Sequence, residues 1–196
     1  MLKKTLAGML ACCSLECALA PTAETPAQEM PAGRYALLVI DMQRYFVSHL
    51  APEEAAREIP NQIEVIRAAQ RNDIPVFVLQ YLGCGPTIEP LMDVISGSEY
   101  HLVIKAADDG FPYTNLDELL KEGGVGTLVL AGINASFCVL STARGAVERG
   151  YDIVTSPEII GDSPQYADRN ESAGWYQANG TWIEGHDELV RLMDGL

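Results

Sequence analysis

The feature that most constrains the fold is a regular alternation of short apolar runs with amphipathic segments, which starts near residue 35. The apolar runs are typical of buried strands, and they lie at 35–41, 74–82, 101–107, 125–132 and 151–156. Segments with helical spacing lie between and after them, at 52–73, 88–96, 115–124, 136–150 and 185–196. This order is typical of βαβ units and therefore of a mostly parallel sheet with helices on both faces, which explains why the strands are apolar throughout.

The chain divides into an N-terminal segment and one domain. No linker or internal repeat interrupts residues 34–196, which we expect to form a single three-layer, doubly wound α/β domain. Residues 1–33 begin with two lysines, continue through an apolar stretch and end rich in Pro, Ala and Thr. This pattern predicts a signal or anchor segment followed by a linker, with lipid attachment at Cys12 or Cys13 as one possibility. An exported protein, periplasmic or secreted, is the expectation, and a cytoplasmic protein with an N-terminal tail is the alternative. Any membrane attachment would use this segment only.

Charge and composition narrow the choice of partners. The formal net charge of −14 argues against a nucleic-acid partner, because phosphate backbones need clustered Lys and Arg. The five cysteines and three histidines do not have the spacing of a structural zinc site. The sequence therefore predicts no metal and no cofactor.

Three reactive residues lie where strands end. Ligands of doubly wound sheets bind beyond the carboxyl ends of the strands. Asp41 and Lys105 fall at or near the ends of their strands, and Cys138 follows the strand at 125–132 and opens the next helix. Each has a purely structural interpretation: a capping carboxylate, a solvated strand end, or a small buried thiol. Together they predict acyl transfer by a cysteine nucleophile. The helix dipole and the lysine would lower the thiol pKa, and free N–H groups at the helix start would stabilise an oxyanion.

The segments around these three residues resemble the isochorismatase-like cysteine hydrolases, which include nicotinamidases, N-carbamoylsarcosine amidase and biuret hydrolase. The resemblance rests on "LLVIDMQRYF", "VIKAADDGFPYTNLDELL" and "LVLAGINASFCVLSTARGAVERGYDIV". It implies that Asp41 is the general base, that Lys105 holds Asp41 and the thiolate, and that Cys138 forms a thioester-type acyl-enzyme. It also implies a cis peptide bond between Ile133 and Asn134, which would turn the Asn134 N–H toward the oxyanion beside that of Cys138.

The resemblance also implies a substrate class and an assembly. The substrate would be a small molecule with an amide or ureido C–N bond, and the protein would be a homo-oligomer. Zinc-dependent nicotinamidases carry an Asp-x-His pair and a further His after the first motif. Here that region offers only His49, so a metal-independent amidase is expected. Aromatic side chains that follow the strands are candidates for the pocket wall, namely Tyr45, Phe46, Tyr81, Phe111 and Phe137. Whether Asp108 or Asp109 faces the pocket stays open.

Three other interpretations remain. An isochorismatase-type vinyl ether hydrolase does not need the cysteine, and a non-catalytic binding member would keep only the fold. A redox protein could pair Cys84, at the end of the second strand, with Cys138.

Overall fold

A computed structural model describes residues 29–165 and 169–196, and it contains one seven-stranded sheet. The strands lie across the sheet in the order β3 (Tyr100–Lys105), β2 (Val76–Tyr81), β1 (Arg34–Ile40), β4 (Val125–Ile133), β5 (Asp152–Thr155) and β7 (Thr181–Trp182). A short strand, β6 (Ile160–Gly161), pairs with the end of β4. All strand pairs of the sheet are parallel, which confirms the predicted fold class.

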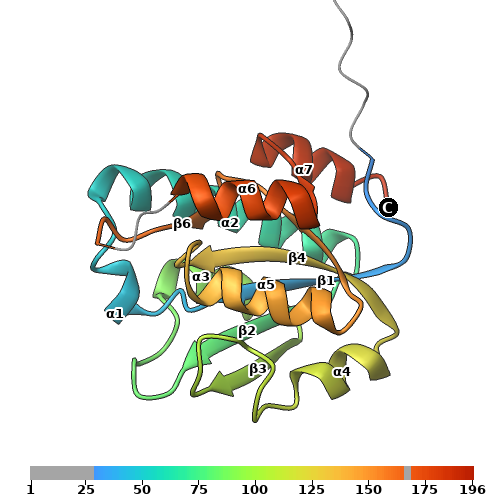
Figure 1. Cartoon of the computed structure of the whole chain (residues 1–196), viewed down its shortest axis with the longest axis horizontal. Coiled ribbons are helices and arrows are strands. Elements are labelled where there is room, and N and C mark those ends of the chain that lie inside the picture. Colours follow the sequence, from blue (N-terminus) through green and yellow to red (C-terminus); the bar gives the residue numbers. More distant parts are fainter. Residues whose placement is uncertain (1–28, 166–168) are drawn as a thin grey trace, which may run out of the picture.

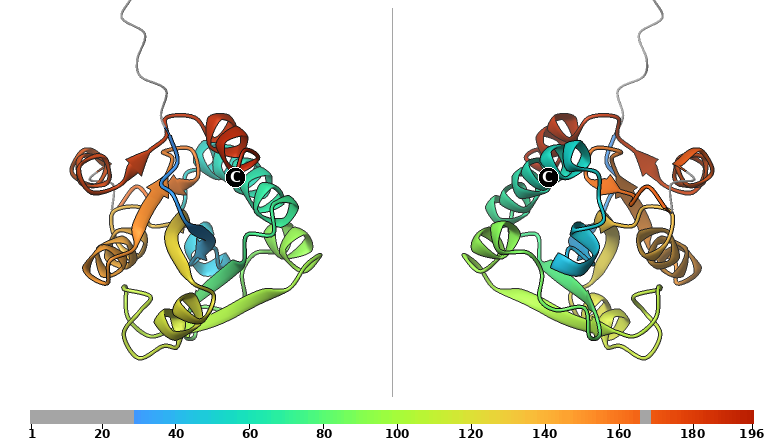
Figure 2. Two further views of the ribbon diagram at one scale, coloured as in Figure 1. Left: turned by 90° about the vertical axis from the view of Figure 1, so that its right-hand side faces the viewer. Right: turned by 90° about the vertical axis from the view of Figure 1, so that its left-hand side faces the viewer.

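Helices cover both faces of this sheet (Figures 1 and 2). One face carries α2 (Pro52–Arg71), α3 (Glu89–Ile95) and α7 (His186–Met193), and the other carries α4 (Leu116–Glu122), α5 (Cys138–Glu148) and α6 (Arg169–Asn179). A single turn of helix, α1 (Arg44–Val47), follows β1. The order of strands reverses between β1 and β4, so the crevice for a ligand is expected beyond the carboxyl ends of these two strands.

The sequence analysis missed four short or weakly patterned elements: α1, β6, α6 and β7. The strands β6 and β7 have two residues each, and they exist because their backbones pair with β4 and β5. Pairing of this kind leaves no periodic signal in a two-residue segment.

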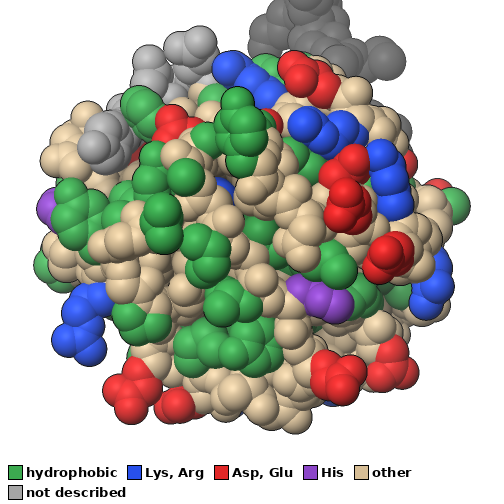
Figure 3. All heavy atoms as spheres, turned by 90° about the horizontal axis from the view of Figure 1, so that it is seen from below, with side chains coloured by type: hydrophobic (Ala, Val, Ile, Leu, Met, Phe, Trp, Pro, Cys, Tyr) green, Lys and Arg blue, Asp and Glu red, His purple; other side chains and the backbone are tan. Residues whose placement is uncertain are grey.

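The edge strand β3 departs from the expectation that helices cover every strand on both faces. Leu102 and Ile104 are 50% and 47% exposed, so the described helices leave these two side chains of the edge strand uncovered. Figure 3 looks onto this side of the molecule from below and shows apolar side chains gathered on it.

The predicted signal or anchor segment lies almost entirely in residues 1–28, outside the described part of the chain. Within the described residues, none of the helices combines the length and the apolar character that crossing a membrane requires.

A glycine near the end of β4 lets the two central strands meet at the crevice. Gly132 pairs with Ile40 and has a φ of +131°. A Cβ atom at Gly132 would lie 2.8 Å from the backbone nitrogen of Ile40 and closer still to its carbonyl oxygen. Only glycine fits this position. The close approach of the two backbones brings the residues after β1 next to the loop after β4.

Gly132→Ala should therefore destabilise the protein by about 3 kcal/mol or more, through steric overlap and an unfavourable φ. Gly126→Ala, in the same strand, is the control, because a Cβ atom there would meet nothing within 4 Å. It should change the free energy of unfolding by less than about 1 kcal/mol. Urea unfolding of both variants measures the difference, and equal losses would contradict the proposed cause.

Candidate active site

A buried ion pair lies at the carboxyl edge of the sheet. Asp41 directly follows β1 and Lys105 is the last residue of β3, so both side chains reach the same edge of the sheet. The Lys105 Nζ lies 2.7 Å from Asp41 Oδ2, and both side chains are 0% exposed. The ammonium also donates to the carbonyl oxygens of Ala107 (3.1 Å) and Asp108 (3.2 Å) and lies 4.7 Å from the centre of the Tyr81 ring. Burial raises the pKa of Asp41, and the charge of Lys105 opposes this rise.

The thiol of Cys138 lies beside this pair, at the first residue of α5, and the residue is 5% exposed. Its Sγ donates to Asp108 Oδ1 at 3.7 Å, and it also interacts with the Asp41 carboxylate. Burial and then the charge of Asp41 raise the pKa of Cys138 well above its usual range, while Lys105 acts in the opposite direction. The expectation of a lowered pKa is therefore wrong for the free site, because loss of water and two carboxylates outweigh one lysine.

The loop before Cys138 contains the expected cis peptide bond, between Ile133 and Asn134. The segment after β6 holds this loop in place. Asp162 Oδ1 accepts bonds from the Ser136 N–H (2.9 Å) and hydroxyl (2.8 Å). Asn134 Oδ1 accepts bonds from the Ser163 N–H (2.8 Å) and hydroxyl (2.9 Å). None of these contacts uses the N–H groups of Asn134 or Cys138, which the resemblance assigns to the oxyanion.

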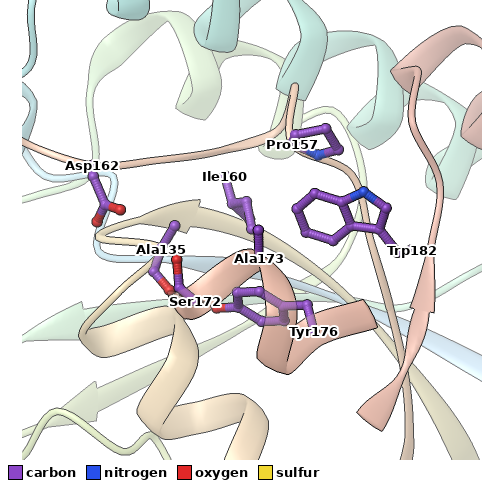
Figure 4. A pocket seen from close by; sticks show the side chains of 8 residues that line it. All are labelled: Ala135, Pro157, Ile160, Asp162, Ser172, Ala173, Tyr176 and Trp182. Carbon is purple, nitrogen blue, oxygen red and sulfur yellow. Dashed lines mark hydrogen bonds between the residues drawn. The ribbon is translucent and has the colours of Figure 1, made fainter. Parts of the chain in front are cut away.

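Helix α6 supports the same loop from behind. The Tyr176 hydroxyl donates to the Ala135 carbonyl oxygen at 2.8 Å. Figure 4 shows Tyr176 below a small, mainly apolar cavity of about 80 Å³, with Asp162 at one end and Trp182 at the other. The sequence analysis missed Asp162, Ser163 and Tyr176. The apolar pair Ile159–Ile160 followed by "GDS" has the pattern of a strand end with polar residues after it, and this signal could have found the first two.

A second cavity, of about 200 Å³, opens over the thiol and is lined by Phe46, Asp108, Asn134, Phe137 and Cys138. Two of the five predicted aromatic residues therefore line it.

The other three predicted aromatic residues lie elsewhere. Tyr81 lies over Lys105, and Tyr45 is 57% exposed and contacts the Phe46 ring edge-on. Phe111 is a core residue instead, because it is 4% exposed and stacks on Tyr151 at 6.0 Å.

The structure shows which of the two neighbouring carboxylates, Asp108 or Asp109, faces the cavity. Asp108 lines the cavity over Cys138. Asp109 turns away: its Oδ1 accepts the Phe111 N–H at 3.0 Å, and its carboxylate packs against Gly145, where a Cβ atom would lie 2.6 Å from Oδ2. Asp109 is therefore a structural residue.

Two further observations concern metals and thiols. Within residues 29–165 and 169–196, no three His, Cys, Asp or Glu side chains are grouped so that they could hold a metal ion. Cys84 and Cys138 are both free thiols.

Comparison with known proteins agrees with this geometry. The isochorismatase domain family matches residues 35–184. This protein belongs to the isochorismatase-like hydrolase family. Two streptothricin hydrolases of Streptomyces noursei are 34% and 35% identical to it, over 161 and 192 residues. The matches cover 71% and 87% of this chain, and 58% and 75% of the relatives' own lengths.

Solved structures of family members have the same fold. An isochorismatase-like hydrolase from Alkaliphilus metalliredigens has a TM-score of 0.71 at 25% identity, over 81% of this chain and 98% of that chain. The N-carbamoylsarcosine amidase from Thermoplasma acidophilum has a TM-score of 0.69 at 25% identity, over 79% and 97% of the two chains.

The ion pair also generates a prediction. Lys105→Met would leave the Asp41 carboxylate buried without its counter-ion, so it should lower the free energy of unfolding by about 3–5 kcal/mol. The double variant Lys105→Met/Asp41→Asn should recover most of this loss, because no buried charge remains. Urea unfolding at pH 7 measures both. A double variant as unstable as the single one would mean that the loss comes from packing and not from charge.

A buried glutamate that packs against β6 generates a further prediction. Glu58 is 0% exposed, its Oε1 accepts Arg57 at 3.2 Å, and its carboxylate packs against Gly161. Burial raises its pKa to about 7, the charge of Asp162 adds to the rise, and Arg57 opposes it. The native state therefore keeps this proton at pH values where the unfolded chain has lost it. Through this group, stability falls as the pH rises from about 4.5 to about 7.

Glu58→Gln cannot lose a proton, so it should gain stability over the wild type as the pH rises, by up to about 3 kcal/mol at pH 8 relative to pH 4.5. Urea unfolding at the two pH values tests this. Glu53→Gln, an exposed change on the same helix, is the control. A Glu58→Gln effect that is independent of pH would show that ionisation of Glu58 does not cost stability.

Proposed function

We propose that this protein is a metal-independent cysteine hydrolase that cleaves a C–N amide or ureido bond of a small molecule through a thioester-type acyl-enzyme. One observation carries the proposal: a thiol in a cavity of about 200 Å³, beside a carboxylate whose counter-ion is a fully buried lysine. The names of two relatives, streptothricin hydrolase and N-carbamoylsarcosine amidase, support a C–N bond as the target.

In the first half-reaction, the Cys138 sulfur attacks the carbonyl carbon of the substrate and Asp41 takes the thiol proton. Because the raised thiol pKa keeps the free site neutral at sulfur, proton transfer accompanies attack instead of preceding it. The N–H groups of Asn134 and Cys138 donate to the developing oxyanion. Asp41 then gives its proton to the leaving nitrogen, the C–N bond breaks, and the acyl group remains on sulfur.

In the second half-reaction, water attacks the thioester carbonyl carbon and Asp41 takes a proton from it. The C–S bond then breaks, the proton returns to sulfur, and the acid product leaves. Lys105 favours the charged form of Asp41 between these steps, since its ammonium opposes the rise in the Asp41 pKa that burial causes.

Replacement of the nucleophile tests this proposal. Cys138→Ala should lower the rate of hydrolysis by at least about 10³-fold, because the covalent route is lost. The assay measures ammonia release from nicotinamide, biuret, N-carbamoyl amino acids and simple aliphatic amides, with and without a chelator. The chelator should have no effect. Cys84→Ala removes the other described free thiol and should keep activity within about twofold. Amide hydrolysis that survives in Cys138→Ala would contradict a thiol nucleophile.

A further inference from the structure

The carboxylate of Asp108 lies at the cavity over the nucleophile, with its Oδ1 3.7 Å from Cys138 Sγ. The side chain is exposed, but its backbone is anchored. The Asp108 carbonyl oxygen accepts Lys105 Nζ at 3.2 Å and the Thr142 hydroxyl at 3.4 Å. A fixed backbone therefore presents a negative charge to any group that approaches the thiol.

The described lining of the cavity supplies no cation to balance this charge. Among the described residues that line it there is neither Lys nor Arg. The ammonium of Lys105, which bonds the Asp108 carbonyl oxygen, is fully buried and paired with Asp41 at 2.7 Å. Asp108 and Asp41 both act on the thiol as negative charges. A substrate with a carboxylate near its scissile bond would be repelled here, and one with a cation would be attracted.

Aromatic rings line the same cavity. Phe46 is half-buried and Phe137 is 44% exposed. Aromatic faces attract ammonium and guanidinium groups and have no such attraction for anions. The Asp108 carboxylate and the aromatic rings therefore both favour a positively charged group in the ligand.

We propose that Asp108 makes this site selective for substrates that carry a positively charged group, an ammonium or a guanidinium, close to the scissile carbonyl. The proposal rests on the proposed function of Cys138 and adds the substrate class. In this role Asp108 is a specificity residue that contacts the substrate, while Asp41 keeps the role of proton acceptor.

Charged thiol reagents test the inference without a known substrate. Trimethylammonioethyl methanethiosulfonate and sulfonatoethyl methanethiosulfonate each transfer a charged alkylthio group to a thiolate and release methanesulfinate. Mass spectrometry of the Cys138 peptide gives the two rates in wild type and Asp108→Asn. The same thiolate attacks both reagents, so the ratio of cationic to anionic rate is independent of the thiol pKa.

In the wild type, we expect this ratio to be larger at Cys138 than at Cys84, which is an internal reference. Asp108→Asn should lower the Cys138 ratio about tenfold and leave the Cys84 ratio unchanged. Asp93→Asn, which removes an equal charge from an exposed position on α3, should leave both ratios as they are.

Three outcomes would overturn the inference: an unchanged ratio in Asp108→Asn, an equal ratio at Cys84 and Cys138 in the wild type, or no reaction of Cys138 with either reagent. Parallel loss of both rates in Asp108→Asn would leave the ratio unchanged and assign Asp108 to proton transfer. The proposed function fails separately, if Cys138→Ala retains amide hydrolysis.

Discussion

The structure of the crevice depends on one ion pair that is entirely removed from water. Moving a carboxylate and an ammonium out of solvent is costly, and their attraction repays it only in good geometry with further hydrogen bonds. Here Asp41 and Lys105 meet at 2.7 Å, and two carbonyl oxygens take further bonds from the ammonium. These carbonyls belong to the segment after β3, so the pair also fixes the backbone of Asp108. The contacts of Lys105 therefore hold both the Asp41 carboxylate and the backbone of Asp108.

Burial, followed by the charge of Asp41, raises the pKa of the thiol. A buried thiol beside two carboxylates holds its proton, and one buried lysine does not reverse this. This site therefore differs from one in which a helix dipole stabilises a thiolate before the substrate binds. It fits the proposed reaction, in which sulfur attacks the substrate carbonyl carbon while Asp41 takes the thiol proton. It also fits the proposed cationic substrate, which would offset part of the negative charge around sulfur.

Much of the fold, and the three candidate site residues Asp41, Lys105 and Cys138, could be predicted from the sequence. The strand that ends at Ile40, the lysine that ends β3 and the cysteine that opens α5 are local signals, because apolar runs and helix starts are visible in short windows. The contacts that hold the loop before Cys138 were not predicted. Ser163 contacts Asn134 across 29 positions and Tyr176 contacts Ala135 across 41, and no local pattern joins residues so far apart.

The sequence by itself determined the parallel α/β architecture and the order Asp41, Lys105, Cys138, because both follow from periodicity and from the rule that strands of a parallel sheet end at one edge. The tertiary structure alone decided which of two adjacent aspartates faces the thiol, which aromatic residues line the cavity, and the direction of the thiol pKa. The physical reason is the same in each case. Burial, side-chain direction and the sum of nearby charges are properties of the packed molecule, and residues that are neighbours in sequence, such as Asp108 and Asp109, can differ in all three.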